Sequence, residues 1–324
     1  MSIFDQKVIK YEMKPLSSLE KVFPDETPVY RMECQMLSGL WGETVSFQVA
    51  YTGDFVMRER LDVCVVSEIA EHVHVRTVEM VPVGRATNGI VDDNYLKTTS
   101  GLYPDLLKDL KDGKVIVYSR QWRSLWVDVD ITNEIPAGEY EIELQLIKEG
   151  EVVCSAKQKV TVIGTELPKL DIMHTEWMHA DCLADYYHVE VFSEEHWKLL
   201  ENYFQEYVKR DCNMMLTPLF TSPLDTAIGL ERTTCQLIDV EVKDGEYVFG
   251  FEKLKRWIDL CKKCGIEYFE MSHLFSQWGA KYAPKVVATV NGKKEKIFGW
   301  HTPAVGEYTK FLESFLPQLT AKLR

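Results

Sequence analysis

The sequence lacks any apolar run long enough to cross a membrane. No stretch of about 18 consecutive apolar residues occurs in its 324 residues. The opening residues, MSIFDQKVIKYEMK, also lack the apolar core of a secretory signal. The sequence therefore predicts a protein without a transmembrane helix or a leader, and we expect a cytoplasmic location.

An excess of positive charge is missing as well. Lys and Arg number 37 against 50 Asp and Glu, which gives a net charge of −13. Nucleic acids and anionic membranes are bound by basic faces, so this balance disfavours both as partners. The eight cysteines are scattered along the chain. Without a leader, they predict free thiols in a reducing compartment.

Several motifs that carry cofactor chemistry are missing. The chain contains no GxGxxG, no P-loop, no GxSxG and no HExxH. Cys261 and Cys264 form a single CxxC at the end of an amphipathic segment, with no second pair to complete a zinc site. We therefore expect no cofactor and no metal.

Two styles of sequence meet near residue 165. Before it, apolar and polar residues alternate in several segments, most clearly at 45–51, 125–131, 140–146 and 152–156. This period of two is typical of antiparallel strands with one face in a core, and it predicts a β-sandwich domain over residues 1–165. The stretch 88–114 lacks the alternation and predicts a long excursion from the sheets.

From residue 166 to 324 the order strand, loop, helix repeats three times. Strands are expected at about 170–175, 213–220 and 266–271, and helices at about 194–210, 252–264 and 306–323. Ser193 is a candidate N-cap and Gly265 a helix stop, while Asn291-Gly292 predicts a hairpin turn in the third loop.

Strands that alternate with helices predict a parallel sheet with right-handed crossovers. A complete (β/α)8 barrel needs roughly 250 residues. We therefore predict a multidomain β plus α/β protein, in which an antiparallel β-sandwich is followed by the first three βα units of an incomplete (β/α)8 barrel. A small open α/β sheet is the alternative.

Aromatic, acidic and histidine side chains gather just after the three predicted strands. On the third strand, Glu270 shares one face with Ser272, and Phe269 and Met271 share the other. The apolar pair should face the helices, so Glu270 should face the barrel interior, where an acid is costly unless it is paired or binds a ligand. The predicted sugar-binding residues are Trp177, His179, Asp181, Asp185, Tyr186, Asp225, Arg232, Glu270, His273, Gln277 and Trp278.

A metal-dependent hydrolase is a weaker alternative. His174, His179 and Asp181 have the chemistry of metal ligands, but no fixed spacing supports a metal site.

Long segments of the chain resemble glycoside hydrolase family 123, the β-N-acetylgalactosaminidases and related bacterial proteins. The resemblance rests on Trp177–Trp197, Asn213–Val240 and Tyr268–Val286, and on Gly101–Leu107 and Trp126–Glu141 in the first domain. It implies a β-sandwich joined to a (β/α)8 barrel. It also implies hydrolysis of terminal β-linked N-acetylgalactosamine, in which the 2-acetamido oxygen of the sugar attacks the anomeric carbon.

In that family a consecutive Asp-Glu pair is catalytic. The Asp orients the acetamido group, and the Glu is the general acid/base. Here the only such dipeptide is Asp25-Glu26, in a proline-flanked turn of the sandwich. We therefore assign no catalytic residue, and we expect a chain truncated before the catalytic strand and inactive as it stands. A non-catalytic carbohydrate-binding protein is the alternative, and the sequence leaves the oligomeric state open.

Overall fold

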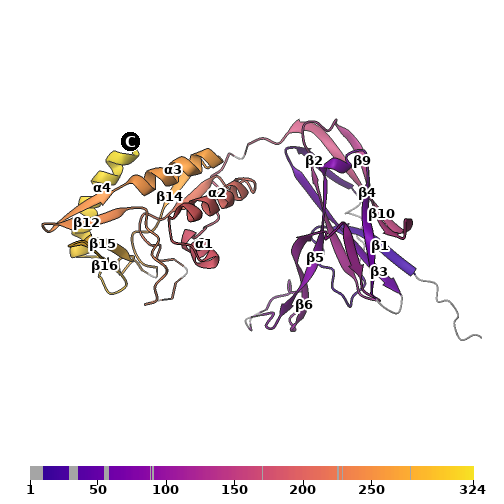
Figure 1. The fold of residues 1–324 in the computed structure, drawn as a ribbon, viewed down its shortest axis with the longest axis horizontal. Coiled ribbons are helices and arrows are strands. Elements are labelled where there is room, and N and C mark those ends of the chain that lie inside the picture. Colours follow the sequence, from indigo (N-terminus) through magenta and orange to yellow (C-terminus); the bar gives the residue numbers. More distant parts are fainter. Residues whose placement is uncertain are drawn as a thin grey trace, which may run out of the picture. The chain divides into compact units, whose positions relative to one another are not determined.

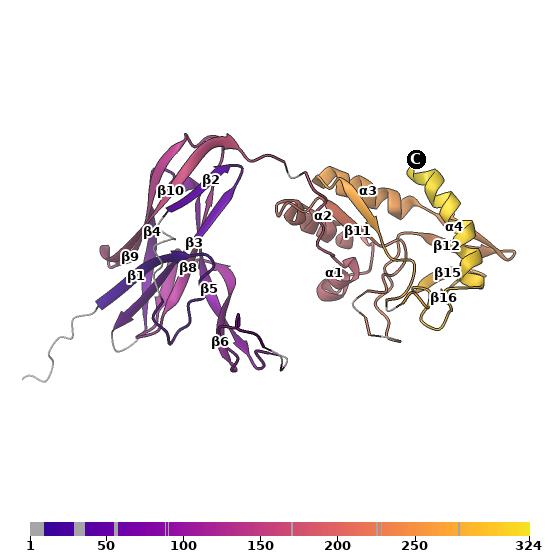
Figure 2. The ribbon, with the colours of Figure 1, turned by 180° about the vertical axis from the view of Figure 1, so that it is seen from behind.

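The computed structural model describes residues 10–28, 36–54, 58–87, 89, 91–169, 171–224, 226–227, 229–277 and 279–324. The chain divides into two compact units, Met1–Lys169 and Leu170–Arg324. The boundary expected after residue 165 falls inside β10 (Glu151–Glu166), the last strand of the first unit. Figures 1 and 2 show the elements of each unit.

The part of the first unit that the structure describes contains two five-stranded sheets, with strand orders β1-β3-β8-β5-β6 and β2-β10-β9-β4-β7. All neighbouring strands are antiparallel except β2 and β10. The strands that accompany β10 are β1 (Lys10–Ser17), β2 (Met36–Trp41), β3 (Thr44–Asp54), β4 (Glu59–Val66), β5 (Val73–Val83), β6 (Gly101–Asp109), β7 (Lys114–Val117), β8 (Arg123–Asp130) and β9 (Gly138–Lys148). A short 3-10 helix, Ala70–His72, precedes β5.

One hydrophobic core joins the two sheets. Phe47 and Val127 from one sheet are buried with Ile142 and Leu144 from the other. These residues belong to the alternating segments, so the predicted antiparallel strands are confirmed. The predicted excursion at 88–114 is wrong in part, because β6 lies within it and pairs with β5 over eight residue pairs.

Over its described residues, the second unit is built from four helices, a parallel strand pair and a separate four-stranded sheet. The helices are α1 (Ala180–Tyr187), α2 (Glu194–Val208), α3 (Glu252–Cys264) and α4 (Glu307–Leu323). The parallel pair is β11 (Met214–Thr217) with β14 (Tyr268–Met271). The separate sheet has the order β13-β12-β15-β16 and contains β12 (Asp239–Lys243), β13 (Glu246–Gly250), β15 (Val286–Val290) and β16 (Lys293–Phe298).

The helix limits follow the capping signals in the sequence. The Ser193 hydroxyl accepts a hydrogen bond from the His196 N–H at 3.2 Å, so Ser193 caps α2 as predicted. Gly265 ends α3 at a φ of 103°, a conformation that costs glycine little. Figure 1 shows α2 and α3 side by side, and Pro317 lies inside α4.

The first strand expected in this unit, at about 170–175, does not form over the described residues 171–175. The side chain of Asn213 binds this segment instead: its Nδ2 donates to the Ile172 carbonyl and its Oδ1 accepts from the His174 N–H, both at 2.8 Å. The backbone N–H groups of Asn213 and Met214 both donate to the His174 carbonyl. Of the three strands predicted for this unit, the described residues therefore form two, β11 and β14.

The four-stranded sheet arises because the second and third loops each form a hairpin. The predicted turn at Asn291-Gly292 has φ values of 50° and 79°, which suit a type I′ turn. Asp244-Gly245, at 51° and 82°, turns β12 into β13. β12 and β15 then pair in parallel, so two hairpins far apart in sequence make one sheet.

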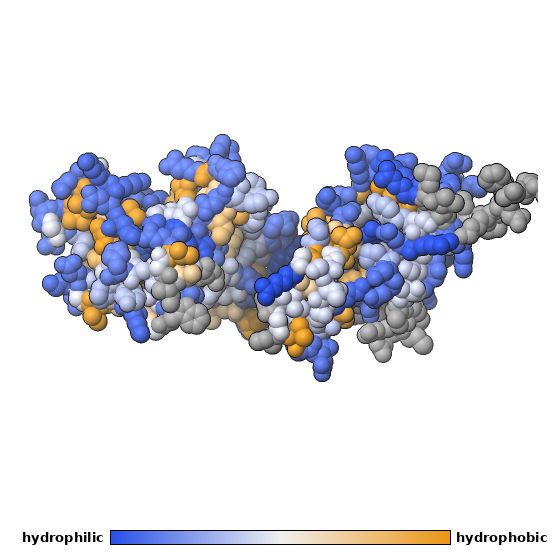
Figure 3. All heavy atoms as spheres, turned by 90° about the horizontal axis from the view of Figure 1, so that it is seen from below, coloured by the Kyte–Doolittle hydropathy of each residue, from blue (hydrophilic) through white to orange (hydrophobic). Residues whose placement is uncertain are grey.

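The surface of each unit is mainly hydrophilic on the face drawn in Figure 3, with separate hydrophobic patches. No helix in the described part of the chain is long and apolar enough to span a membrane.

Candidate sugar-binding site

The strand β14 presents its acid on the side that was predicted. Phe269 and Met271 line a groove with Leu254 and Ile258 of α3, so the apolar face of the strand points to the helices. Glu270 lies on the opposite face and is half-buried. The next residue on that face, Ser272, is 2% exposed, and its hydroxyl has no hydrogen-bond partner among the described residues.

Trp177, Glu270 and His273 form one cluster, although they come from two loop entrances. The indole Nε1 of Trp177 donates to Glu270 Oε2 at 2.9 Å. The His273 ring meets Trp177 edge-on, with ring centroids 5.5 Å apart. Trp177 remains 46% exposed, so a carboxylate fixes the orientation of an indole that still offers surface to a ligand.

Tyr207 of α2 holds the segment that carries Trp177. Its hydroxyl donates to the Met214 carbonyl at 2.6 Å and accepts from the Glu176 N–H at 2.8 Å. The phenol thus connects the residue before Trp177 to the first residue of β11. With the Asn213 amide, it fixes the entrance to the site without a regular strand ladder.

Helix α1 carries two acids that bind the second loop. Asp181 accepts two hydrogen bonds from Arg232, at 2.9 Å from Nε and 3.1 Å from Nη2. One turn further on, Asp185 accepts from the Thr233 hydroxyl at 2.9 Å. The consecutive loop residues Arg232 and Thr233 thus bind two acids on one face of α1. Asp181 and Arg232, both predicted as sugar-binding residues, bind each other.

The Asp181–Arg232 pair is largely enclosed, with side-chain exposures of 9% and 12%. Burial opposes the charge on Arg232, but the hydrogen bonds and the charge of Asp181 raise its pKa above the ordinary value. Arg232 also donates to the Leu224 carbonyl and to Cys182 Sγ, both at 3.2 Å. The guanidinium is therefore an anchor that orders the loop.

His196 joins α1 to α2. Its Nδ1 accepts from the Phe192 N–H at 2.9 Å, so its Nε2 carries the proton and donates to the Ala180 carbonyl at 2.9 Å. The side chain is fully buried, and this burial lowers the pKa of His196 below its ordinary value of 6.5. The neutral ring thus holds the first residue of α1.

We expect His196 to make stability depend on pH. The unfolded chain takes up the proton near pH 6.5, while the folded chain takes it up only at lower pH. Stability should therefore be full above pH 6.5 and fall below it, by up to about 1.4 kcal/mol per pH unit. Urea unfolding between pH 7.5 and 5 should show a weaker pH dependence in His196→Gln than in the native chain. The exposed His301→Gln variant is the control, and a native-like pH dependence in His196→Gln would contradict this role.

The remaining predicted residues are placed differently. His179 is the half-buried N-cap residue of α1, and Gln277 is half-buried. Tyr186 is 76% exposed and packs edge-on against Tyr187. Asp225 and Trp278 lie outside the described residues.

The three residues of the metal alternative do not converge. His174 Nδ1 lies 3.1 Å from the Asp211 carbonyl, and Asp181 is engaged by Arg232. Among the described residues, no group of three His, Cys, Asp or Glu side chains could hold a metal ion. Cys261 of the single CxxC lies in the core, and burial raises the pKa of its thiol.

The sandwich dipeptide Asp25-Glu26 binds a surface lysine. Lys97 Nζ lies 3.2 Å from Asp25 and 2.8 Å from Glu26, and it also sits 4.0 Å from the centre of the Phe23 ring. The Lys97 hydrogen bond lowers the pKa of Asp25. Both carboxylates thus help to hold a turn of the sandwich.

Three residues that position the site were not singled out for it from the sequence. Tyr207 lies within the helix predicted at about 194–210, and a buried phenol needs a hydrogen-bond partner. Asn213 and Thr233 gave no signal, because their partners are 39 to 48 residues away in the chain.

The second unit thus places an oriented, exposed indole beside a half-buried acid at the carboxyl ends of parallel strands. In α/β enzymes, active sites lie at this end of the parallel strands. Residues 177–324 match the sequence family described as glycoside hydrolase 123, catalytic domain. Over this segment the chain is similar to the catalytic domain of glycoside hydrolase family 123.

The fold agrees with a solved structure of that family. A family 123 glycoside hydrolase from Clostridium perfringens, described for glycolipid glycan hydrolysis, superposes with a TM-score of 0.69 at 14% identity. The alignment covers 97% of this chain and 56% of that one, so the chain spans little more than half of the solved protein.

A β-glucosidase from Listeria innocua with bound isofagomine reaches a TM-score of 0.23 at 10% identity, over 49% of this chain and 17% of that one. This similarity is too low to carry an argument. No curated protein matches the sequence.

Proposed function

We propose that the second unit binds terminal β-linked N-acetylgalactosamine as part of a glycoside hydrolase that acts by substrate-assisted retaining hydrolysis. The observation that carries the proposal is the indole of Trp177, oriented by Glu270 and still half exposed. An indole face suits the apolar side of a pyranose, and a carboxylate suits its hydroxyls. Two residues after this acid, the buried hydroxyl of Ser272 has no hydrogen-bond partner among the described residues.

The proposal assigns no acid/base to these 324 residues. The family's consecutive Asp-Glu pair has no counterpart except Asp25-Glu26, which binds Lys97 in the sandwich. Loss of general acid catalysis lowers rates by about 100- to 10,000-fold. We therefore propose that the 324-residue polypeptide binds the sugar but hydrolyses it poorly. We also propose that its second unit forms an incomplete (β/α)8 barrel, and that the protein acts in the cytoplasm.

Trp177→Ala should weaken N-acetylgalactosamine binding roughly tenfold, because it removes an apolar surface worth about 1–2 kcal/mol. Calorimetric titration of the free sugar into the native chain and the variant measures this change. Tyr95→Ala, an exposed aromatic of the other unit, is the matched control. Glu270→Gln keeps an oxygen for the indole N–H and tests the carboxylate charge alone. Equal affinities in native protein and Trp177→Ala would refute the assignment.

A non-catalytic carbohydrate-binding protein is the second candidate, because the oriented indole alone would serve that role. An aryl β-N-acetylgalactosaminide assay on the 324-residue chain and on any longer natural form separates the two. Sugar binding without hydrolysis in every form would favour the second candidate. Hydrolysis by a longer form that Trp177→Ala weakens would favour the first.

A further inference from the structure

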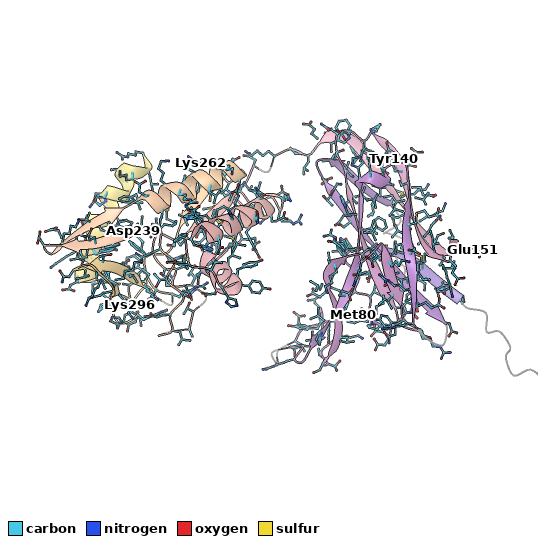
Figure 4. All side chains as sticks on the ribbon, in the orientation of Figure 1. Met80, Tyr140, Glu151, Asp239, Lys262 and Lys296 are labelled. Carbon is cyan, nitrogen blue, oxygen red and sulfur yellow. The ribbon has the colours of Figure 1, made fainter. Side chains whose placement is uncertain are left out.

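The sandwich contains a cleft that the proposed function does not use. It has a volume of about 610 Å³ and opens between the sheet that contains β5 and the sheet that contains β4 and β7. Met80, labelled in Figure 4, is one of its lining residues. Its volume falls within the range of roughly 300–1,000 Å³ that is usual for small-ligand sites.

The charge of this cleft opposes that of the chain. Five cationic side chains line it, against the two carboxylates of Glu79 and Asp109, whereas the whole chain has a net charge of −13. The cationic residues are Arg60, Lys108, Lys111, Lys114 and Arg123. A concave surface lined by one sign of charge concentrates ligands of the opposite sign.

The cations are not all used by the fold. Arg60 pairs with Asp112 at 2.8 Å and Lys114 with Asp62 at 3.0 Å. Lys108 and Lys111 are exposed, and their ammonium groups make no ion pair with any described residue. Two lysines of the cleft therefore remain available to an anion.

Arg123 adds a directional donor. Its guanidinium lies 5.0 Å from the centre of the Tyr118 ring, and its Nη2 donates to Gln121 at 2.9 Å. Its Nε is buried and has no partner among the described residues. A guanidinium that lies over an aromatic ring is restricted in orientation and can bind a carboxylate or a sulfate through its N–H groups.

We propose that this cleft is a second binding site, and that it takes an acidic saccharide through sulfate or carboxylate groups. Lys108, Lys111 and Arg123 are by themselves the reason why the ligand of this cleft should carry oxyanions. The saccharide scaffold rests on the proposed function of the second unit. Nucleic acid fits less well, because the overall negative charge of the chain would repel a long polyanion.

The full chain is titrated calorimetrically with four probes: a heparin-derived tetrasaccharide, trigalacturonate, a neutral chitotetraose and inorganic sulfate. We expect an acidic saccharide to bind more tightly than the neutral one and than inorganic sulfate, with an affinity that falls as ionic strength rises. Comparison of the tetrasaccharide with trigalacturonate tells sulfate recognition from carboxylate recognition.

The double variant Lys108→Gln/Lys111→Gln should weaken acidic-saccharide binding at least about tenfold, because it removes two charge-assisted contacts. Lys10→Gln/Lys159→Gln makes the same charge change at exposed sandwich lysines outside the cleft and should bind normally. Trp177→Ala should also bind normally, which separates this site from the proposed sugar site. Native affinity in the Lys108/Lys111 variant would overturn the site, and equal affinity for inorganic sulfate and the saccharides would overturn the saccharide assignment.

Discussion

Phe311→Ala is expected to lower the free energy of unfolding of the second unit by about 3–5 kcal/mol. Phe311 of α4 is fully buried and is the centre of an aromatic cluster. It contacts the rings of Phe220, Tyr247, Phe249, Phe298, Tyr308 and Phe315. Removal of its ring would leave a cavity between α4 and the sheet that the two hairpins form.

Chemical denaturation of the 324-residue chain measures this effect. Because the chain has two compact units, its unfolding needs a probe for each, and the far-UV signal of the helices reports mainly on the second unit. Phe275→Ala is the matched control, since Phe275 is 37% exposed and, among the described rings of the cluster, contacts Tyr308 alone. A similar cost for both variants would show that the aromatic cluster does not hold α4 to the sheet.

The fold was predictable where a local pattern decides the structure. The alternation around Phe47 and Val127 defined strands because the two faces of each strand meet different surroundings. Ser193 and Gly265 marked helix ends for reasons contained in a few residues. The hairpin at Asn291-Gly292 is a further case of local control.

Prediction failed where distant residues replace a local signal. The apolar segment near Ile172 has the composition of a strand, but the Asn213 side chain takes the backbone groups that a strand ladder would use. Asp244-Gly245 has turn chemistry as good as that of Asn291-Gly292, but the strands on either side of it are too short to give a clear alternating pattern. The two hairpins form one sheet because Glu241 of β12 pairs with Thr289 of β15. No short stretch of sequence contains both residues.

In the candidate site, too, local patterns were predictable and distant contacts were not. The side of β14 on which Glu270 lies followed from the two-residue period of a strand. The structure confirms that its neighbours Phe269 and Met271 face α3. The roles of Asp181 and Arg232 did not follow, because a carboxylate near a barrel mouth and a structural ion pair look alike in sequence. Only the contact across 51 residues shows that each satisfies the other.

Asp181→Ala is expected to destabilise the second unit by about 3–5 kcal/mol, because it leaves the enclosed guanidinium of Arg232 without its counter-charge. Asp181 lies in the first turn of α1, close to Trp177, so loss of the pair should also free the second loop and weaken sugar binding. Asp185→Ala, which removes only the exposed contact with Thr233, should cost about 1 kcal/mol or less.

The double variant Asp181→Ala/Arg232→Met decides whether the cost is that of an unpaired charge. Replacement of both partners leaves no buried ion, so it should recover most of the stability that Asp181→Ala loses. Urea denaturation of the native chain, both single variants and the double variant gives the coupling free energy directly. A double variant as unstable as Asp181→Ala would mean that the carboxylate supports α1 by some means other than Arg232. Recovery of stability without recovery of N-acetylgalactosamine affinity would show that the sugar site needs the loop geometry that only the ion pair imposes.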